Sequence, residues 1–194
     1  MNIKVNNLFK SFNGQQVLNN VSLSFAEGGI TCIMGTSGVG KTTLANIMMG
    51  LRKADSGKII GLQGKKISAV FQEDRLIEHL DAIKNIMLVC PKDMKKEVIE
   101  DNLKEIGLTE YKDKPTKSLS GGMRRRVVMV RALLSDYDVL IMDEPFKGLD
   151  EELKGRVINY VKEKTKGKTV VIITHDKDEA AMLEASVLTM KSND

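Results

Sequence analysis

A glycine-rich loop between a short apolar run and a helix-forming segment constrains the fold of this 194-residue chain more than any other stretch. The apolar run, residues 30–34, suits a buried strand of a parallel sheet. The loop that follows matches the pattern G-x-x-x-x-G-K-[ST]. Residues 41–49 then have helical spacing, with an expected apolar side made of Leu44, Ile47, Met48 and Leu51. Strand, glycine-rich loop and helix in this order predict an α/β core that binds phosphate.

Each residue type of the loop has a chemical reason to be there. The glycines let backbone N–H groups wrap the α- and β-phosphates without Cβ clashes. Lys41 can reach the β- and γ-phosphates, and the Thr42 hydroxyl is available to Mg²⁺. The alternative is an ordinary glycine-rich turn. The predicted nucleotide-binding residues are Gly35, Thr36, Ser37, Gly38, Val39, Gly40, Lys41, Thr42 and Thr43.

The rest of the chain alternates between strand and helix patterns. Period-two alternation over residues 17–25 and an Asn13-Gly14 turn predict short strands within the first thirty residues. Three further apolar runs predict buried strands at residues 67–71, 139–142 and 169–173. A helical pattern separates the last two, with an apolar side of Leu153, Val157, Tyr160 and Val161. This order predicts an α/β fold with a mainly parallel sheet and an N-terminal antiparallel β subdomain.

A helical segment interrupts the strand pattern in the middle of the chain. From about residue 76 to residue 116 the character is helix, turn, helix, and residues 97–103 have helical spacing that stops near Gly107. We expect one domain over residues 1–194. Residues 1–75 and 124–194 would form its nucleotide-binding core, and residues 76–123 an inserted helical subdomain.

Two carboxylates end one of the apolar strands. Asp143 follows residues 139–142, and the carboxyl end of such a strand is where a residue can hold a Mg²⁺ shell. Glu144 comes next, points the other way, and can face a γ-phosphate to orient or deprotonate water. A lone Asp-Glu pair is usually a surface feature. Its place after four apolar residues and downstream of the loop favours the catalytic interpretation.

A second phosphate-binding device lies far from the first. Leu119-Ser120-Gly121-Gly122-Met123 opens a helix whose apolar side is Val127, Val130 and Leu134. A glycine pair after a serine leaves backbone N–H groups bare, and such groups bind phosphate at a helix N-terminus. The two devices indicate a nucleotide held from two sides.

These motifs resemble the ATP-binding cassette (ABC) ATPases, the motor subunits of ABC transporters. The resemblance covers essentially the whole chain, and its motifs occur in the family's order: the phosphate loop, Gln72, the Leu119–Gly122 stretch, Asp143-Glu144, Gly148-Leu149-Asp150 and His175. It implies a head-to-tail dimer with two ATP molecules between the subunits. Ser120, Gly121 and Gly122 would then serve the γ-phosphate of the ATP held by the opposite chain.

The resemblance also implies roles for four single residues. Gln72 would ligate Mg²⁺ or water and sense a transmembrane partner, and His175 would contact the γ-phosphate. Asp150 would link the two sites, and Phe12 would stack on adenine. Each has a plainer alternative: Gln72 ends a strand, His175 caps the helix after it, and Phe12 is core.

Within the family, the chain resembles the importers of nitrate, sulfonate and taurine-like solutes. Met123 stands where the family usually has Gln, and Pro145-Phe146 follows that branch. Lys147-Gly148 departs from it. Because Met cannot complete a capping box with Ser120, we expect a looser helix start and predict that Met123→Gln raises thermal stability.

Composition limits the other function classes. The formal net charge is +4, and the 30 basic and 26 acidic residues interleave, which indicates a solvated surface rather than a nucleic-acid stripe. Aromatic residues are only 4%, so base-stacking platforms are not expected. Cys32 and Cys90 lack metal-ligand spacing and are expected to be inert thiols. Apolar runs are too short to cross a bilayer, and no signal peptide is expected.

We therefore expect a cytoplasmic ATPase subunit of an importer, peripheral on the inner face of the membrane. Its cofactors would be ATP and Mg²⁺. Its partners would be a second ATPase subunit, separate transmembrane permease subunits and a solute-binding protein, without nucleic acid. One alternative is a non-transport ABC ATPase acting on nucleic acid or ribosomes. The other is a silent scaffold, which Glu144 and His175 argue against.

Overall fold

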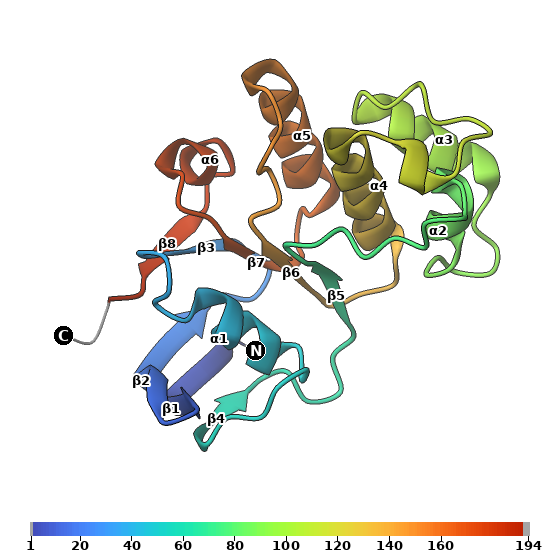
Figure 1. Cartoon of the computed structure of the whole chain (residues 1–194). Helices are drawn as coiled ribbons and strands as arrows, with labels where there is room; N and C mark the ends of the chain where they lie inside the picture. The colour runs from blue at the N-terminus through green and yellow to red at the C-terminus, as the bar shows by residue number, and fades with distance from the viewer. Residues whose placement is uncertain (1, 192–194) are drawn as a thin grey trace.

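The framework of the molecule is a five-stranded parallel sheet in the order β5-β6-β7-β3-β8. The structure is a computed structural model that describes residues 2–191. Its first strand in the chain, β3, lies between β7 and β8, so the phosphate loop leaves the interior of the sheet (Figure 1). The strands are β3 (Ile30–Met34), β5 (Ile67–Val70), β6 (Val139–Asp143), β7 (Thr169–Ile173) and β8 (Ser186–Thr189).

A second, antiparallel sheet of three strands has the order β2-β1-β4 and confirms the N-terminal β subdomain. Asn13 (φ 48°) and Gly14 (φ 81°) form the tight turn between its first two strands. The expectation of short strands here is wrong, because bulges interrupt the side-chain alternation of two long strands. The three strands are β1 (Ile3–Phe12), β2 (Gln15–Phe25) and β4 (Ser56–Ile60).

The helices are divided between the two faces of the parallel sheet (Figure 1). The first helix, α1, lies on one face together with the antiparallel sheet, and α4, α5 and α6 lie on the other, with α2 and α3 beyond α4. The bounds are α1 (Lys41–Met48), α2 (Ala82–Met87), α3 (Lys96–Glu105), the 3₁₀ turn η1 (Thr116–Ser118), α4 (Gly121–Leu134), α5 (Glu151–Lys164) and α6 (Lys177–Met182).

Alternate side chains of the central strands build two separate apolar cores. On β6, Leu140 and Met142 pack with α4 and α5, whereas Val139 and Ile141 pack with α1 and the antiparallel sheet. Successive side chains of a strand point to opposite faces, so one five-residue strand serves both cores. The continuous apolar runs seen in the sequence follow from this double burial.

Leu51 lies outside the apolar side expected for the first helix. The helix ends at Met48, and Gly50 takes a left-handed conformation (φ 71°), which turns the chain away. As a result, the Leu51 side chain is 55% exposed.

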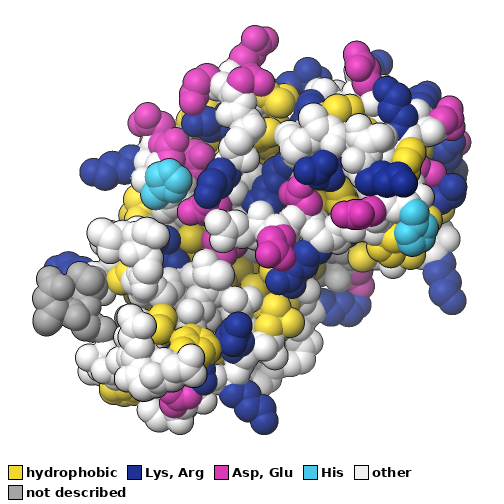
Figure 2. Space-filling model, viewed as in Figure 1, with side chains coloured by type: hydrophobic (Ala, Val, Ile, Leu, Met, Phe, Trp, Pro, Cys, Tyr) yellow, Lys and Arg dark blue, Asp and Glu magenta, His cyan; other side chains and the backbone are white. Residues whose placement is uncertain are grey.

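The structure also describes the helix lengths, the surface charge and the thiol of Cys32. No helix within residues 2–191 is both long and apolar enough to cross a bilayer. Basic and acidic side chains are intermixed over the face shown in Figure 2. Cys32 is buried in β3, and this burial raises its thiol pKa to about 12, which keeps it protonated and inert.

Candidate active site

Most of the predicted site residues meet in one cavity of about 400 Å³ at the carboxyl ends of β3 and β6. This edge of a parallel sheet is where loops converge and ligands bind. Among the residues that line the cavity are Gly35, Thr36, Ser37, Gly38, Gly40, Lys41, Thr42, Thr43, Gln72, Asp143, Glu144 and His175.

The glycines of the loop are required by its backbone path. Gly38 (φ +83°) and Gly40 (φ +97°) are both left-handed, a region that residues with a Cβ rarely adopt. Gly40 also caps α1, since its carbonyl accepts a 2.8 Å hydrogen bond from the Leu44 amide. Val39 packs its side chain against the core between the parallel sheet, α1 and the antiparallel sheet, so only its backbone is available to the cavity.

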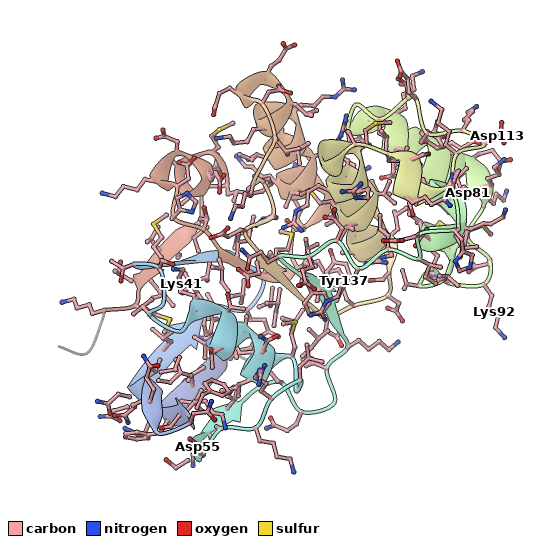
Figure 3. All side chains as sticks on the ribbon, in the orientation of Figure 1. Lys41, Asp55, Asp81, Lys92, Asp113 and Tyr137 are labelled. Atoms are coloured by element: carbon pink, nitrogen blue, oxygen red, sulfur yellow. The ribbon has the colours of Figure 1, made fainter. Side chains whose placement is uncertain are left out.

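The basic and hydroxyl groups of the loop are held in place by the protein itself. Lys41 Nζ donates to the carbonyl oxygens of Gly35 (2.8 Å) and Thr36 (2.9 Å). Figure 3 places Lys41 between α1 and the β3–β8 edge of the sheet. Thr42 Oγ1 donates a 2.7 Å hydrogen bond to Asp143 Oδ2, which joins the start of α1 to the end of β6.

Asp143 is a buried carboxylate with only 5% of its surface exposed. Burial raises its pKa, and the hydrogen bond from Thr42 opposes that shift. Two groups whose oxygen atoms can ligate a metal ion, the Thr42 hydroxyl and the Asp143 carboxylate, therefore lie side by side at the loop. Within residues 2–191, no three His, Cys, Asp or Glu side chains gather as a metal-ligand set. A Mg²⁺ ion that takes its remaining ligands from phosphate and water fits such a site.

Glu144 has an unusual backbone for a residue with a side chain. Its φ is +45°, and its amide donates to the Ile173 carbonyl at 2.9 Å. One carboxylate oxygen, Oε1, lies 3.7 Å from His175 Nδ1. The other, Oε2, lies 3.0 Å from Lys147 Nζ, but outside hydrogen-bond geometry, so the contact is an ion pair only. Glu144 and His175 thus face each other across the cavity.

His175 does not cap the helix after it. Asp176 caps α6, because its side chain accepts a 2.8 Å hydrogen bond from the Asp178 amide. The His175 side chain is 72% exposed at the rim of the cavity. The capping alternative is therefore wrong, and His175 is free to meet a ligand.

Gln72 lies two residues beyond the end of β5, in a segment of residues 71–75 held by α4. Arg125 makes the main contact between α4 and this segment, and only 5% of its surface is exposed. The sequence analysis did not identify this residue. Its spacing was the available signal, since Val128, Met129 and Ala132 share its helix face and are all buried.

The second predicted phosphate-binding stretch, residues 119–122, is called the signature stretch below and lies elsewhere. Ser120 caps α4 by accepting a 3.2 Å hydrogen bond from the Met123 amide, but Ser120, Gly121 and Gly122 do not line the phosphate cavity. Their neighbours belong to the next loop: a Cβ on Gly122 would lie 3.8 Å from the Leu149 side chain. Asp150 caps α5 there, accepting a 2.9 Å hydrogen bond from the Leu153 amide.

Phe12 does not line the phosphate cavity, and it is not core either. It is half-buried at the end of β1, with the cations of Lys10 and Arg52 at 5.3 and 5.1 Å from its ring centroid. The core alternative for Phe12 is therefore wrong.

A second cavity of about 450 Å³ lies on the helical side of the molecule. It is lined by residues of α2, α3 and the following loop, including Asp81 and Asp113, which Figure 3 shows far from Lys41. It contains no glycine-rich backbone and no residue of the motifs above.

The parallel sheet, the loop wrapped at its edge and the Thr42–Asp143 pair together define a phosphate-loop nucleotide-binding protein. The family model described as ABC transporter matches residues 18–147 of the chain. The chain belongs to the ABC transporter family, as its motif order led us to expect.

Curated relatives cover nearly all of the chain. The taurine import ATP-binding protein TauB of Roseobacter denitrificans is 36% identical, over 97% of this chain and 77% of its own. The aliphatic sulfonates import ATP-binding protein SsuB 1 of Pseudomonas savastanoi is 35% identical, over 99% and 81%. The spermidine/putrescine import protein PotA of Clostridium novyi is 33% identical, over 97% of this chain and only 59% of its own length. The resemblance to the sulfonate and taurine branch is confirmed.

Solved structures agree on the fold. The dimeric structure of MJ0796, a bacterial ABC transporter cassette, superposes with a TM-score of 0.85 at 28% identity, covering 97% of this chain and 94% of the other. The same cassette in a post-hydrolysis state bound to ADP and Pi gives a TM-score of 0.84 at 26% identity, covering 99% and 97%.

Proposed function

We propose that this chain is the ATP-hydrolysing nucleotide-binding subunit of an ABC importer. The observation that carries the proposal is the convergence of Lys41, the Thr42–Asp143 pair, Glu144 and His175 on one cavity. Relatives named as import ATP-binding proteins and a neighbour bound to ADP and Pi support hydrolysis coupled to import. They favour transport over a role on nucleic acid or ribosomes.

The loop binds the nucleotide in this proposal. Backbone N–H groups from Gly35 to Thr43 surround the phosphates, and Lys41 neutralises their charge. Thr42 and Asp143 hold Mg²⁺, with Gln72 close enough to supply a further oxygen. When bound, the ion neutralises charge on the phosphate oxygens.

Glu144 is the residue that orients or deprotonates the attacking water. Its carboxylate faces the cavity from the end of β6, and its left-handed backbone aims it differently from Asp143. His175, 3.7 Å away, contacts the terminal phosphate and fixes the Glu144 carboxylate beside it. The two side chains come from different strand ends, so the sheet sets their spacing.

The signature stretch serves a second subunit. Ser120, Gly121 and Gly122 open the 14-residue α4 away from the phosphate cavity, with the positive end of the helix free to meet an anion. In a head-to-tail dimer they contact the γ-phosphate held by the other chain, and the neighbouring Asp150 links the sites. Phe12 stacks on adenine in the same arrangement.

The membrane partners are separate permease subunits. Residues 76–123, as an inserted helical subdomain between core segments 1–75 and 124–194, contact them together with the Gln72 segment. A solute-binding protein delivers the solute from outside. The chain then resides in the cytoplasm, peripheral on the inner face of the membrane.

The test is ATP turnover by the purified full chain and by its Glu144→Gln variant. We expect turnover to fall at least about 100-fold in the variant while MgATP binding stays within about threefold, because Gln keeps the size of Glu but is no base. Hydrolysis by Glu144→Gln at the normal rate would sink the catalytic assignment. No turnover and no nucleotide binding by the parent chain would sink the function itself.

A further inference from the structure

Three arginines on one side of α4 hold the segment of residues 71–75 that contains Gln72. Arg131 donates to the Arg75 carbonyl at 2.9 Å and to the Asp74 carbonyl at 3.4 Å. Arg124 Nε lies 3.5 Å from one Asp74 carboxylate oxygen, and Arg125 Nη1 lies 3.6 Å from the other. The helix that begins with the signature stretch is therefore tied to the Gln72 segment by backbone hydrogen bonds and by two ion pairs to Asp74.

Arg125 also reaches the other side of the site. Its Nη1 donates to the Phe71 carbonyl at 2.5 Å, just before Gln72. Its Nη2 donates to the carbonyls of Asp143 (2.9 Å) and Glu144 (2.7 Å), and its Nε donates to the Pro145 carbonyl at 2.9 Å. One side chain thus bonds the backbone on both sides of the cavity.

No other residue type fits this set of contacts. Four carbonyls converge from two strand ends, and only the planar guanidinium offers enough donors in a fixed fork to meet them all. The side chain is 6% exposed, so water does not replace these bonds. Burial lowers the Arg125 pKa, and Asp74 is the main opposing charge. The Asp74–Arg125 ion pair keeps the buried cation compensated.

One backbone position that Arg125 holds, Glu144, is strained. Glu144 has φ +45°, which is unfavourable for a side-chain-bearing residue and persists only when its surroundings fix it. The Glu144 amide is fixed by Ile173, and its carbonyl by Arg125. The direction of the Glu144 carboxylate therefore depends on both bonds.

We propose that Arg125 is a positioning residue that fixes Glu144 and Gln72 relative to each other and to the signature helix. The proposal rests on the proposed function, in which Glu144 acts on water and Gln72 reports the membrane partner. Arg125 is not among the residues that line the phosphate cavity. Of the two sides of the cavity, Arg124 and Arg131 reach only the Gln72 segment, whereas Arg125 joins α4 to both.

The experiment measures kcat and KM for MgATP in the full chain, with thermal unfolding of each variant. Arg125→Gln keeps a planar amide but loses the charge and most donors. Arg125→Lys keeps the charge and loses the fork. Arg156→Gln is the matched control, because Arg156 also bonds two backbone carbonyls, those of Lys104 and Glu105, far from the cavity.

We expect Arg125→Gln to lower kcat at least about tenfold with KM within about threefold, because misplacing a catalytic group affects turnover more than binding. Arg125→Lys should recover part of that loss. Arg156→Gln should lower the unfolding temperature with kcat within about twofold of the parent. If Arg125→Gln does not fold, Arg125→Lys is measured against the parent and should lose at least about threefold in kcat.

The inference is overturned if the Arg125 variants turn over at the parent rate, or if kcat falls equally in Arg156→Gln. A rise in KM in proportion to any loss would also overturn it, since that would place Arg125 in nucleotide binding. Failure of the proposed function looks different: the parent chain itself would not hydrolyse ATP, or Glu144→Gln would be as active as the parent.

Discussion

Gly40 allows a close approach between the phosphate loop and β2, and replacing it by Ala should destabilise the chain strongly. A Cβ at this position would lie 2.9 Å from the Val17 carbonyl oxygen and 2.5 Å from Leu18 Cδ2. The first neighbour is backbone and the second is a fully buried side chain, so neither can move away easily. The left-handed backbone of Gly40 adds a conformational penalty of its own.

Gly38 provides a matched control in the same loop. Its backbone is also left-handed, but a Cβ there would meet nothing within 4 Å. Gly38→Ala therefore carries only the conformational penalty, about 1–2 kcal/mol. Gly40→Ala carries the same penalty plus about 1–3 kcal/mol for overpacking. For a chain of this size, 1 kcal/mol lowers the unfolding temperature by about 2–4 °C. The expected losses are about 2–8 °C for Gly38→Ala and about 4–20 °C for Gly40→Ala.

The assay is thermal unfolding of the nucleotide-free chain, followed by circular dichroism. Nucleotide is left out because both glycines lie in the loop that would bind it, and ligand binding would add its own stabilisation. Equal losses in the two variants would refute the reasoning, since they would mean that the contact with Val17 and Leu18 does not fix Gly40.

Three further outcomes are expected. Met123→Gln gains a bond to the Ser120 amide but loses apolar packing against the core that contains α4 and α5. The stabilisation predicted from sequence should therefore shrink to under about 2 °C in unfolding temperature. Burial raises the pKa of Glu179 in the folded chain, so ionisation of this carboxyl group lowers the free energy of unfolding as the pH rises above about 4.5. Glu179→Gln should therefore raise the unfolding temperature at pH 7 but not at pH 4. Cys32, with a pKa of about 12, should resist alkylation by iodoacetamide at pH 8 in the folded chain and react at once in urea. Because Cys90 is only half-buried, labelling is assigned to each cysteine by peptide mass spectrometry, and rapid labelling of Cys32 in the native protein would contradict its burial.

The sequence predicted the interior strands well because of their double burial. Residues 30–34 and 169–173 were identified with their observed bounds, since both faces of β3 and β7 are covered and leave a continuous apolar run. The same reasoning missed β4 and β8. Ser56–Ile60 and Ser186–Thr189 are short edge strands with exposed positions, so they carry no run of apolar residues.

The sequence predicted those site residues that belong to recognisable motifs. The sequence placed Lys41, Asp143, Glu144 and His175 together, and all of them line one cavity. Arg125 was missed because an arginine beside two others in a helix resembles surface charge, although its spacing puts it on the buried face of α4. Its role depends on four carbonyls contributed by two strand ends, and only the fold brings those together.

The position of β3 in the sheet has a consequence for how the protein is made. The strand that carries the phosphate loop leaves the ribosome early, but its two neighbours, β7 and β8, begin only at Thr169 and Ser186. At about 5–20 residues per second, roughly 7 to 27 s separate the synthesis of Met34 from that of Thr169. During that interval β3 has both edges unpaired. A nascent chain can therefore display the whole loop motif without a framework to shape it, and ATP binding should appear only after β7 and β8 have been synthesised.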